Sequence, residues 1–182
     1  MIRFDGVACM RGQRLLFEGF DLAIGAGEAV MVTGPNGCGK SSLLRLAAGL
    51  LRPAAGTVDR TVAVALADDA LALDQERTLG EALGWWAKLD GRAAALDSVG
   101  LGHLADVSVR LLSTGQQRRA RVARVVASGA PLWLLDEPSN GLDRDGIAAL
   151  DAAIERHRSS GGAVLAASHV ALAGEWRTVA VG

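Results

Sequence analysis

The stretch that decides the fold is Gly34-Pro35-Asn36-Gly37-Cys38-Gly39-Lys40-Ser41, which matches the pattern G-x-x-x-x-G-K-[ST]. A fully apolar segment, 29–32, precedes this loop, and a segment with leucines at helical spacing, 43–50, follows it. A glycine-rich loop between a buried strand and a helix N-terminus presents backbone N–H groups and a positive dipole end to phosphate. The sequence therefore predicts a triphosphate site in an α/β protein with a mostly parallel central sheet.

Each residue type in this loop suits phosphate chemistry. Glycines let the backbone approach phosphate oxygens, Lys40 supplies a mobile cation for the β- and γ-phosphates, and the Ser41 hydroxyl is placed to ligate Mg²⁺. Cys38 is interpreted as a tolerated small residue and not as a redox switch. We expect nucleotide contacts from the loop and the start of its helix: Gly34, Pro35, Asn36, Gly37, Cys38, Gly39, Lys40, Ser41 and Ser42.

A second motif ends another apolar segment. Residues 132–135 read Leu-Trp-Leu-Leu, and Asp136, Glu137 and Pro138 follow them. Carboxylates at the carboxyl end of a central parallel strand lie beside the phosphate loop, because ligands collect at that edge of the sheet. We expect Asp136 to hold Mg²⁺ and Glu137 to polarise the attacking water as a general base.

A third motif, Leu112-Ser113-Thr114-Gly115-Gln116, lies about twenty residues before the acidic pair. It resembles the signature of ABC transporter ATPases, usually written LSGGQ, with Thr114 in place of the first glycine. The resemblance covers nearly the whole chain and implies a P-loop NTPase ABC ATPase fold. It also implies a homodimer with ATP at the interface, in which Ser113, Gly115 and Gln116 of one subunit approach the nucleotide held by the other.

Two further pieces match the same family. Residues 139–143, Ser-Asn-Gly-Leu-Asp, resemble the D-loop of the dimer interface, which makes Asp143 an expected nucleotide contact. His169, after the apolar segment 163–167, resembles the switch histidine that contacts the γ-phosphate and pairs with the general base. The resemblance thus implies Lys40, Glu137 and His169 as catalytic residues, with ATP and Mg²⁺ as cofactors.

Two pieces depart from the family pattern. No glutamine stands where the family senses Mg²⁺ and the membrane subunit. Asp68, Asp69 or no residue at all takes that role, and Gln75 comes too late in the chain. The aromatic residue that many relatives stack on adenine is replaced by Arg11, whose guanidinium plane could stack instead. The preference for ATP over other nucleotides stays open at this point.

The chain is interpreted as a single ABC ATPase domain, 1–182, with a catalytic core of 1–68 and 113–182. Alternating apolar residues in 2–24 predict an N-terminal antiparallel β part with a turn at Arg11-Gly12-Gln13, and Pro53 and Gly56 are expected to close the unit that follows the phosphate loop. Residues 69–112, rich in alanine and leucine, predict a small helical subdomain. It is expected to carry the surface for a membrane partner. Either one of Trp85 and Trp86 lines a groove for that partner, or both are core residues of the subdomain.

Composition limits the other functional classes. The net charge is −1, so no broad basic field favours nucleic acid as a partner. The two cysteines lack the spacing of a metal or redox pair, which indicates a reducing compartment. No apolar run approaches the roughly 18 residues of a membrane span, and the N-terminus lacks a signal-peptide core. We therefore expect a peripheral protein at the cytoplasmic face of the bacterial inner membrane, held by integral membrane subunits.

A finer resemblance concerns the ATP-binding subunits of the cytochrome c maturation system. It is carried by 112–119, with paired glutamines and arginines, by Trp133 inside its strand, and by the helix of 43–53. It implies that ATP hydrolysis powers haem export or release of a loaded haem chaperone. No haem-ligand motif is present, since His103 and His157 are lone residues, so direct haem binding is not expected.

Three alternatives remain open from the residues alone. The chain could be an ABC exporter ATPase for another substrate, with the same chemistry. It could be an ABC-type ATPase acting on DNA or ribosomes, although that class usually has a second cassette, a coiled coil or a basic surface. It could also be a non-hydrolysing regulator, which the missing glutamine allows and the intact Lys40, Asp136, Glu137 and His169 disfavour. Arg118, Arg119, Arg121 and Arg124 are interpreted as a solvated or interface face of the helix 113–127.

Overall fold

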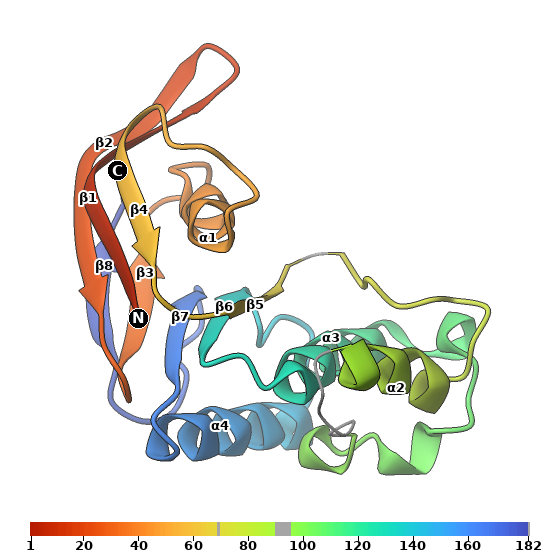
Figure 1. The fold of residues 1–182 in the computed structure, drawn as a ribbon. Coiled ribbons are helices and arrows are strands. Elements are labelled where there is room, and N and C mark those ends of the chain that lie inside the picture. Colours follow the sequence, from red (N-terminus) through yellow and green to blue (C-terminus); the bar gives the residue numbers. More distant parts are fainter. Residues whose placement is uncertain (69, 90–95, 182) are drawn as a thin grey trace.

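The computed structural model describes residues 1–68, 70–89 and 96–181, and for 85–89 it describes the backbone alone. Asp69 and the side chains of Trp85 and Trp86 therefore lie outside the described part. The described residues form two sheets, four helices and three short 3-10 segments (Figure 1). An antiparallel sheet and a parallel sheet lie side by side, as the alternating and the fully apolar stretches of the sequence predict.

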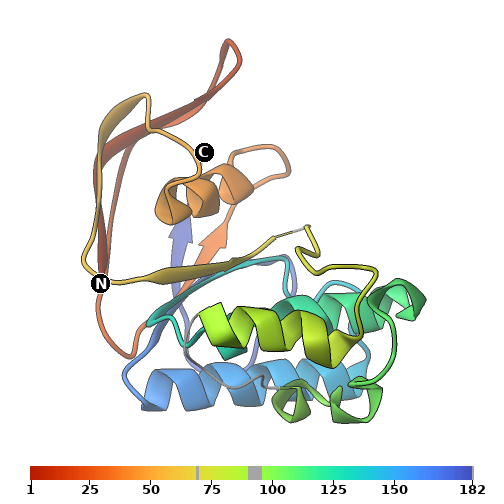
Figure 2. The ribbon, with the colours of Figure 1, turned by 45° about the vertical axis from the view of Figure 1, so that its right-hand side comes forward.

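The antiparallel sheet has the strand order β2-β1-β4. Strands β1 (Ile2–Arg11) and β2 (Arg14–Ile24) pair across the predicted turn at Gly12. Phe4 packs edge-on against Phe20, with ring centroids 5.6 Å apart, because alternate residues of both strands face the core. The hairpin extends beyond the rest of the chain at the top of both views (Figures 1 and 2).

The third strand of this sheet, β4 (Ala55–Arg60), was not predicted, since Pro53 and Gly56 were expected only to close the unit after the phosphate loop. Its sequence, AGTVDR, has no apolar alternation, so nothing local marks it as a strand. Pairing with β1 creates it. Gly56 has φ +75, and an added Cβ would collide with the Asp5 carbonyl oxygen, so this close crossing requires glycine.

The parallel sheet has the strand order β5-β6-β7-β3-β8, and every neighbouring pair in it is parallel. The central strands β6, β7 and β3 are almost fully buried, which explains their uninterrupted apolar sequences. The five strands are β3 (Ala29–Thr33), β5 (Val64–Ala67), β6 (Leu132–Asp136), β7 (Ala163–Ala167) and β8 (Arg177–Ala180).

Helices cover both faces of the parallel sheet. Helix α1 (Lys40–Ala48) lies between the two sheets, where Leu43, Leu44 and Leu46 are buried (Figures 1 and 2). Leu50, expected on the same apolar side, is 69% exposed, because the helix ends at Ala48 and the chain turns at Gly49. On the opposite face lie α2 (Leu79–Leu89), α3 (Thr114–Ser128) and α4 (Arg144–Ser159).

The segment between β5 and α3 contains α2 and three 3-10 segments: η1 (Asp97–Val99), η2 (Gly102–Leu104) and η3 (Val109–Leu111). These elements share a core with α3 and α4 through buried residues such as Leu83, Leu101 and Val109. Among the described residues, no helix is both long enough and apolar enough to cross a membrane.

Two arginines of α3 make hydrogen bonds to backbone carbonyl oxygens at the end of β5 and just beyond it. Arg124 donates a hydrogen bond to the Leu66 carbonyl, and Arg121 donates one to the Asp68 carbonyl at 2.7 Å. Their side chains thus hold the carboxyl end of the edge strand β5 against α3. This part of the helix face, which was expected to be solvated or at an interface, is half-buried and bonded to β5 and to the residue that follows it.

Candidate nucleotide-binding site

The phosphate loop connects β3 to α1 and takes its shape from glycines in the left-handed region. Gly34, Gly37 and Gly39 have φ of +145, +78 and +117. A Cβ on Gly34 would collide with the Val181 carbonyl oxygen, and one on Gly39 would lie 2.9 Å from the Phe17 ring. The loop is thus pressed between β8 and the hairpin sheet, so only glycine can occupy these two positions.

Lys40 begins α1 and is 8% exposed. Its ammonium donates hydrogen bonds to the carbonyl oxygens of Gly34 at 2.8 Å and Pro35 at 3.1 Å. These bonds hold the cation over the loop and satisfy two of its three donors. The loop therefore carries a prepositioned positive charge beside the N-terminus of α1, an arrangement suited to a bound polyphosphate.

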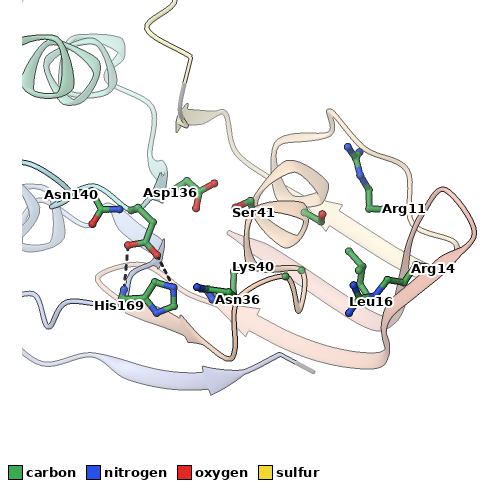
Figure 3. A pocket seen from close by; sticks show the side chains of 13 residues that line it. Arg11, Arg14, Leu16, Asn36, Lys40, Ser41, Asp136, Asn140 and His169 are labelled. Atoms are coloured by element: carbon green, nitrogen blue, oxygen red, sulfur yellow. Dashed lines mark hydrogen bonds and ion pairs between the residues drawn. The ribbon is translucent and has the colours of Figure 1, made fainter. Parts of the chain in front are cut away.

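A pocket of about 580 Å³ opens over the loop. Figure 3 shows its two ends: Asp136, Asn140 and His169 at one, and Arg11, Arg14 and Leu16 at the other. Its lining includes ten predicted nucleotide, metal and catalytic residues, Arg11, Asn36, Gly37, Gly39, Lys40, Ser41, Ser42, Asp136, Glu137 and His169, together with Arg14, Leu16 and Asn140, which were not predicted.

Glu137 is held in place by its backbone as well as by its neighbours. It is one of two non-glycine residues with positive φ among those described, at +46, and its N–H donates to the Ala167 carbonyl at 2.8 Å. A left-handed glutamate costs roughly 1–3 kcal/mol and persists only where the surroundings impose it. The hydrogen bond to Ala167, at the end of β7, holds the Glu137 backbone in this conformation, and the Glu137 side chain lines the pocket.

His169 meets Glu137 through two contacts, drawn as dashed lines in Figure 3. The His169 backbone N–H donates to Glu137 Oε2 at 3.2 Å, and His169 Nε2 lies 3.4 Å from Glu137 Oε1. The carboxylate is thereby oriented and still one-fifth exposed, so it can both accept a proton and reach a water molecule.

Ser41 and Asp136 line the same pocket, at the start of α1 and the end of β6. A hydroxyl and a carboxylate are hard oxygen donors of the kind that Mg²⁺ prefers, and Mg²⁺ usually takes only one or two protein ligands besides phosphate and water. Within the described residues no group of three or more His, Cys, Asp or Glu could hold a metal by itself. The donor set therefore fits a metal that arrives with a polyphosphate.

The signature residues do not line this pocket. Ser113 caps α3 by accepting from Gln116 N at 3.3 Å, while Gln116 Oε1 accepts from Ser113 N at 2.8 Å, which is a capping box. Asp143 caps α4 by accepting from Gly146 N at 2.9 Å, and it lies 3.9 Å from Arg119. Gly34, Pro35 and Cys38 belong to the loop but not to the pocket lining.

Asp68, one candidate for the missing glutamine, follows β5. Its carboxylate lies 3.7 Å from Arg45 of α1 and accepts a hydrogen bond from Ala70 N at 3.1 Å. It is not part of the pocket lining, although it shares a narrow crevice with Asp136 and Glu137. Gln75 lies farther along the chain, where its carbonyl accepts from Ser108.

The chain is similar in sequence to known proteins. Residues 17–140 match the family model described as ABC transporter. The cytochrome c biogenesis ATP-binding export protein CcmA of Sphingopyxis alaskensis is 59% identical over 95% of this chain and 92% of its own length. The protein of the same description from Novosphingobium aromaticivorans is 54% identical, over 96% and 92%. The chain belongs to the CcmA group of the ABC transporter family.

Solved structures agree on the fold. An ATP-binding subunit of an ABC transporter superposes with a TM-score of 0.88 at 22% identity, over all of this chain and 85% of that one. A dimeric ATP-binding cassette with ADP and Pi superposes with a TM-score of 0.78 at 22% identity, over 93% and 88%. The predicted ABC ATPase fold, with its antiparallel and parallel sheets, is confirmed, and so is the finer resemblance to the cytochrome c maturation subunits.

As a member of this family the chain is an ABC transporter ATPase, which binds ATP. Three pocket residues were not predicted as site residues: Arg14, Leu16 and Asn140. The signal for Arg14 was available, because the two-residue turn Gly12-Gln13 makes Arg11 and Arg14 direct cross-strand partners. No sequence signal distinguished Leu16 from its neighbour Leu15, which is 48% exposed.

Proposed function

We propose that the chain is the ATP-hydrolysing subunit of an exporter for cytochrome c biogenesis, working as a homodimer under integral membrane subunits. The observation that carries the proposal is the Glu137–His169 pair, which faces the phosphate loop across one pocket. The cellular role is supported by the relatives, which are cytochrome c biogenesis ATP-binding export proteins. We take haem, or a loaded haem chaperone, as the cargo whose movement is driven, without haem binding by this chain.

In this proposal the phosphate loop and Lys40 hold the β- and γ-phosphates. Bound Mg²⁺, held by Ser41 and Asp136, would supply charge neutralisation as the γ-phosphate leaves. Glu137 accepts a proton from the attacking water, because its carboxylate is fixed by the backbone and by His169. His169 keeps the carboxylate oriented and offers a hydrogen-bond donor toward the γ-phosphate.

The homodimer is inferred from where the signature lies. Ser113, Gly115 and Gln116 form the N-terminus of α3, a ready anion site, yet they do not line the pocket of their own chain. In a head-to-tail dimer these residues would contact the γ-phosphate held by the partner's Lys40. Hydrolysis then removes those contacts and opens the dimer, and the membrane subunits respond to the closing and opening.

The test compares wild type with Glu137→Gln in Mg²⁺-dependent ATP hydrolysis and in size exclusion with and without ATP. We expect wild type to hydrolyse ATP and Glu137→Gln to lose roughly 100- to 10,000-fold in rate. The variant should elute as a dimer only with ATP. The matched control is Glu18→Gln. It should behave as wild type, because Glu18 is exposed on β2 and lies outside the pocket.

If wild type binds ATP without turnover, the assay is repeated with the co-expressed membrane subunits. Hydrolysis that appears there and depends on Glu137 supports the proposal. Continued inactivity in that complex would overturn it in favour of a non-hydrolysing regulator.

A further inference from the structure

We propose that Arg118 positions the general base, because its side chain fastens the turn 139–142 to the first turn of α3 and so keeps Glu137 in place. The inference rests on the proposed function, which takes Glu137 as the residue that activates the attacking water. It deepens that function by naming a residue outside the nucleotide pocket on which the rate of hydrolysis depends.

The turn 139–142 packs directly on the start of α3, and the contact is made through Gly141. The Gly141 carbonyl oxygen lies against Gly115, where an added Cβ would come within 3.2 Å of it. Three residues later on the same helix, the Arg118 side chain lies across Gly141, and a Cβ there would collide with the guanidinium group. Residues three apart share one face of a helix, so Gly115 and Arg118 hold the turn together. With φ +65 as well, position 141 suits glycine.

Backbone hydrogen bonds connect this turn to Glu137. Leu142 N donates to the Ser139 carbonyl at 3.1 Å, and Asn140 N donates to the Glu137 carbonyl at 3.2 Å. Ser139 is only 5% exposed, so the middle of the turn is packed against the rest of the chain. Glu137 has the strained φ of +46, which persists only while its surroundings impose it. A turn released from α3 would therefore let the Glu137 backbone relax and its carboxylate lose its alignment in the pocket.

The charge of Arg118 faces the acidic pair as well. A crevice of about 20 Å³ is lined by Arg118 together with Asp136 and Glu137, and both carboxylates also line the nucleotide pocket. Among the residues that the structure describes, Arg118 makes no ion pair, so packing on Gly141 determines where its guanidinium group lies. A cation beside two neighbouring carboxylates lowers their mutual repulsion. Arg118 therefore supports the acidic pair both by packing and by charge.

The experiment measures kcat and KM for Mg²⁺-dependent ATP hydrolysis by the complex with its membrane subunits, and urea unfolding of each variant chain. The test variant is Arg118→Met, which keeps a long unbranched side chain and removes the guanidinium group. The matched control is Arg156→Met, because Arg156 is exposed in the last turn of α4 and lines neither the pocket nor the crevice. Gly141→Ala is a second test variant, since its Cβ would displace the Arg118 side chain.

We expect Arg118→Met to lower kcat roughly 10- to 100-fold, because a small displacement of a catalytic group has an effect of that size. KM for ATP should stay within about a factor of two, since the contact acts on the reaction and not on binding. Gly141→Ala should lower kcat by a similar factor, and the double variant should lose no more than either single variant, because both substitutions break the same contact. Arg156→Met should match wild type, and Arg118→Met should unfold at nearly the wild-type urea concentration.

Several results would overturn the positioning role while leaving the proposed function intact. An unchanged kcat for Arg118→Met would do so, and so would a raised KM at constant kcat, which would place Arg118 in nucleotide binding. A loss of rate matched by an equal loss of folded chain would assign the residue to stability. Additive losses in the double variant would show that Arg118 and Gly141 act separately. A wild-type complex that binds ATP without hydrolysing it would instead overturn the proposed function, and the positioning role with it.

Discussion

The two ends of the nucleotide pocket are built in different ways. At the phosphate end, backbone dihedrals and main-chain hydrogen bonds place the functional groups: Gly39 at φ +117, Glu137 at φ +46, and Lys40 bonded to two loop carbonyls. At the hairpin end, the lining comes from side chains beside a projecting turn, and Arg11 and Arg14 make no ion pairs among the described residues. The geometry of the phosphate end therefore depends on the backbone, whereas that of the hairpin end depends on a few exposed side chains.

This division has a physical origin. Phosphate transfer needs charges fixed before the reaction, and only a packed backbone avoids the cost of reorganising them. Substitutions at the first end should therefore affect stability and rate together, and those at the second end affinity alone.

The largest expected effect is at Lys40. Lys40→Ala should lower kcat/KM for ATP by roughly 100- to 1000-fold, because it removes a preorganised cation from the developing charge. Steady-state hydrolysis of ATP by the variant, in the complex with its membrane subunits, measures this. Arg52→Ala, an exposed cation beyond α1, is the control and should stay within a factor of two of wild type. An unchanged rate for Lys40→Ala would show that the fixed cation at the phosphate end does not contribute to hydrolysis.

An effect of intermediate size is expected when one glycine from each end of the pocket is replaced by alanine. Gly39→Ala should cost about 2–3 kcal/mol of unfolding free energy, because φ is +117 and the new Cβ would meet the Phe17 ring. Gly12→Ala in the hairpin turn, at φ +60 with no atom within 4 Å of its Cβ, should cost about 1 kcal/mol. Urea unfolding of both variants measures the difference. Equal losses would mean that packing around the loop adds nothing to its backbone strain.

The smallest expected effect concerns His157, which lies outside both ends of the nucleotide pocket. His157 stacks on Trp133 with centroids 3.9 Å apart and planes 8° apart. Burial lowers the pKa of His157, opposed by backbone hydrogen bonds with Ala163 and Pro131. Because the unfolded chain then binds more protons, the free energy of unfolding should fall as pH drops below the unfolded value of about 6.5.

Urea unfolding at pH 7.5 and 5.5 measures this loss. His157→Phe keeps a ring against Trp133 and removes the titrating group, so its stability should change less between the two pH values. Its ATP affinity at pH 7.5 should equal that of wild type, since His157 does not line the pocket. The same pH dependence in the variant would assign the effect to other groups.

The strongest sequence-based predictions concerned local motifs. The phosphate loop, the acidic pair at 136–137 and the apolar strands each carry their signal in a short stretch, because backbone geometry and side-chain chemistry are set there by neighbouring residues. Strands β3, β6 and β7 lie almost where the apolar runs place them, and the predicted histidine meets Glu137 although 32 residues separate them. The order of motifs along the chain was enough to name the fold.

The tertiary structure decided what depends on contacts between distant segments. Strand β4 exists because β1 pairs with it, and its polar, glycine-containing sequence has no strand signal of its own. From the sequence, Arg121 and Arg124 belong to a solvated or interface face of their helix, and only the structure shows their hydrogen bonds to the carbonyl oxygens of Asp68 and Leu66. Leu16 lines the pocket and Leu50 is exposed, and the hydrophobic periodicity of the sequence predicts neither placement. A sequence determines the propensities and chemistry of each segment, whereas the partner that satisfies a carbonyl or buries a side chain is known only once the segments have met.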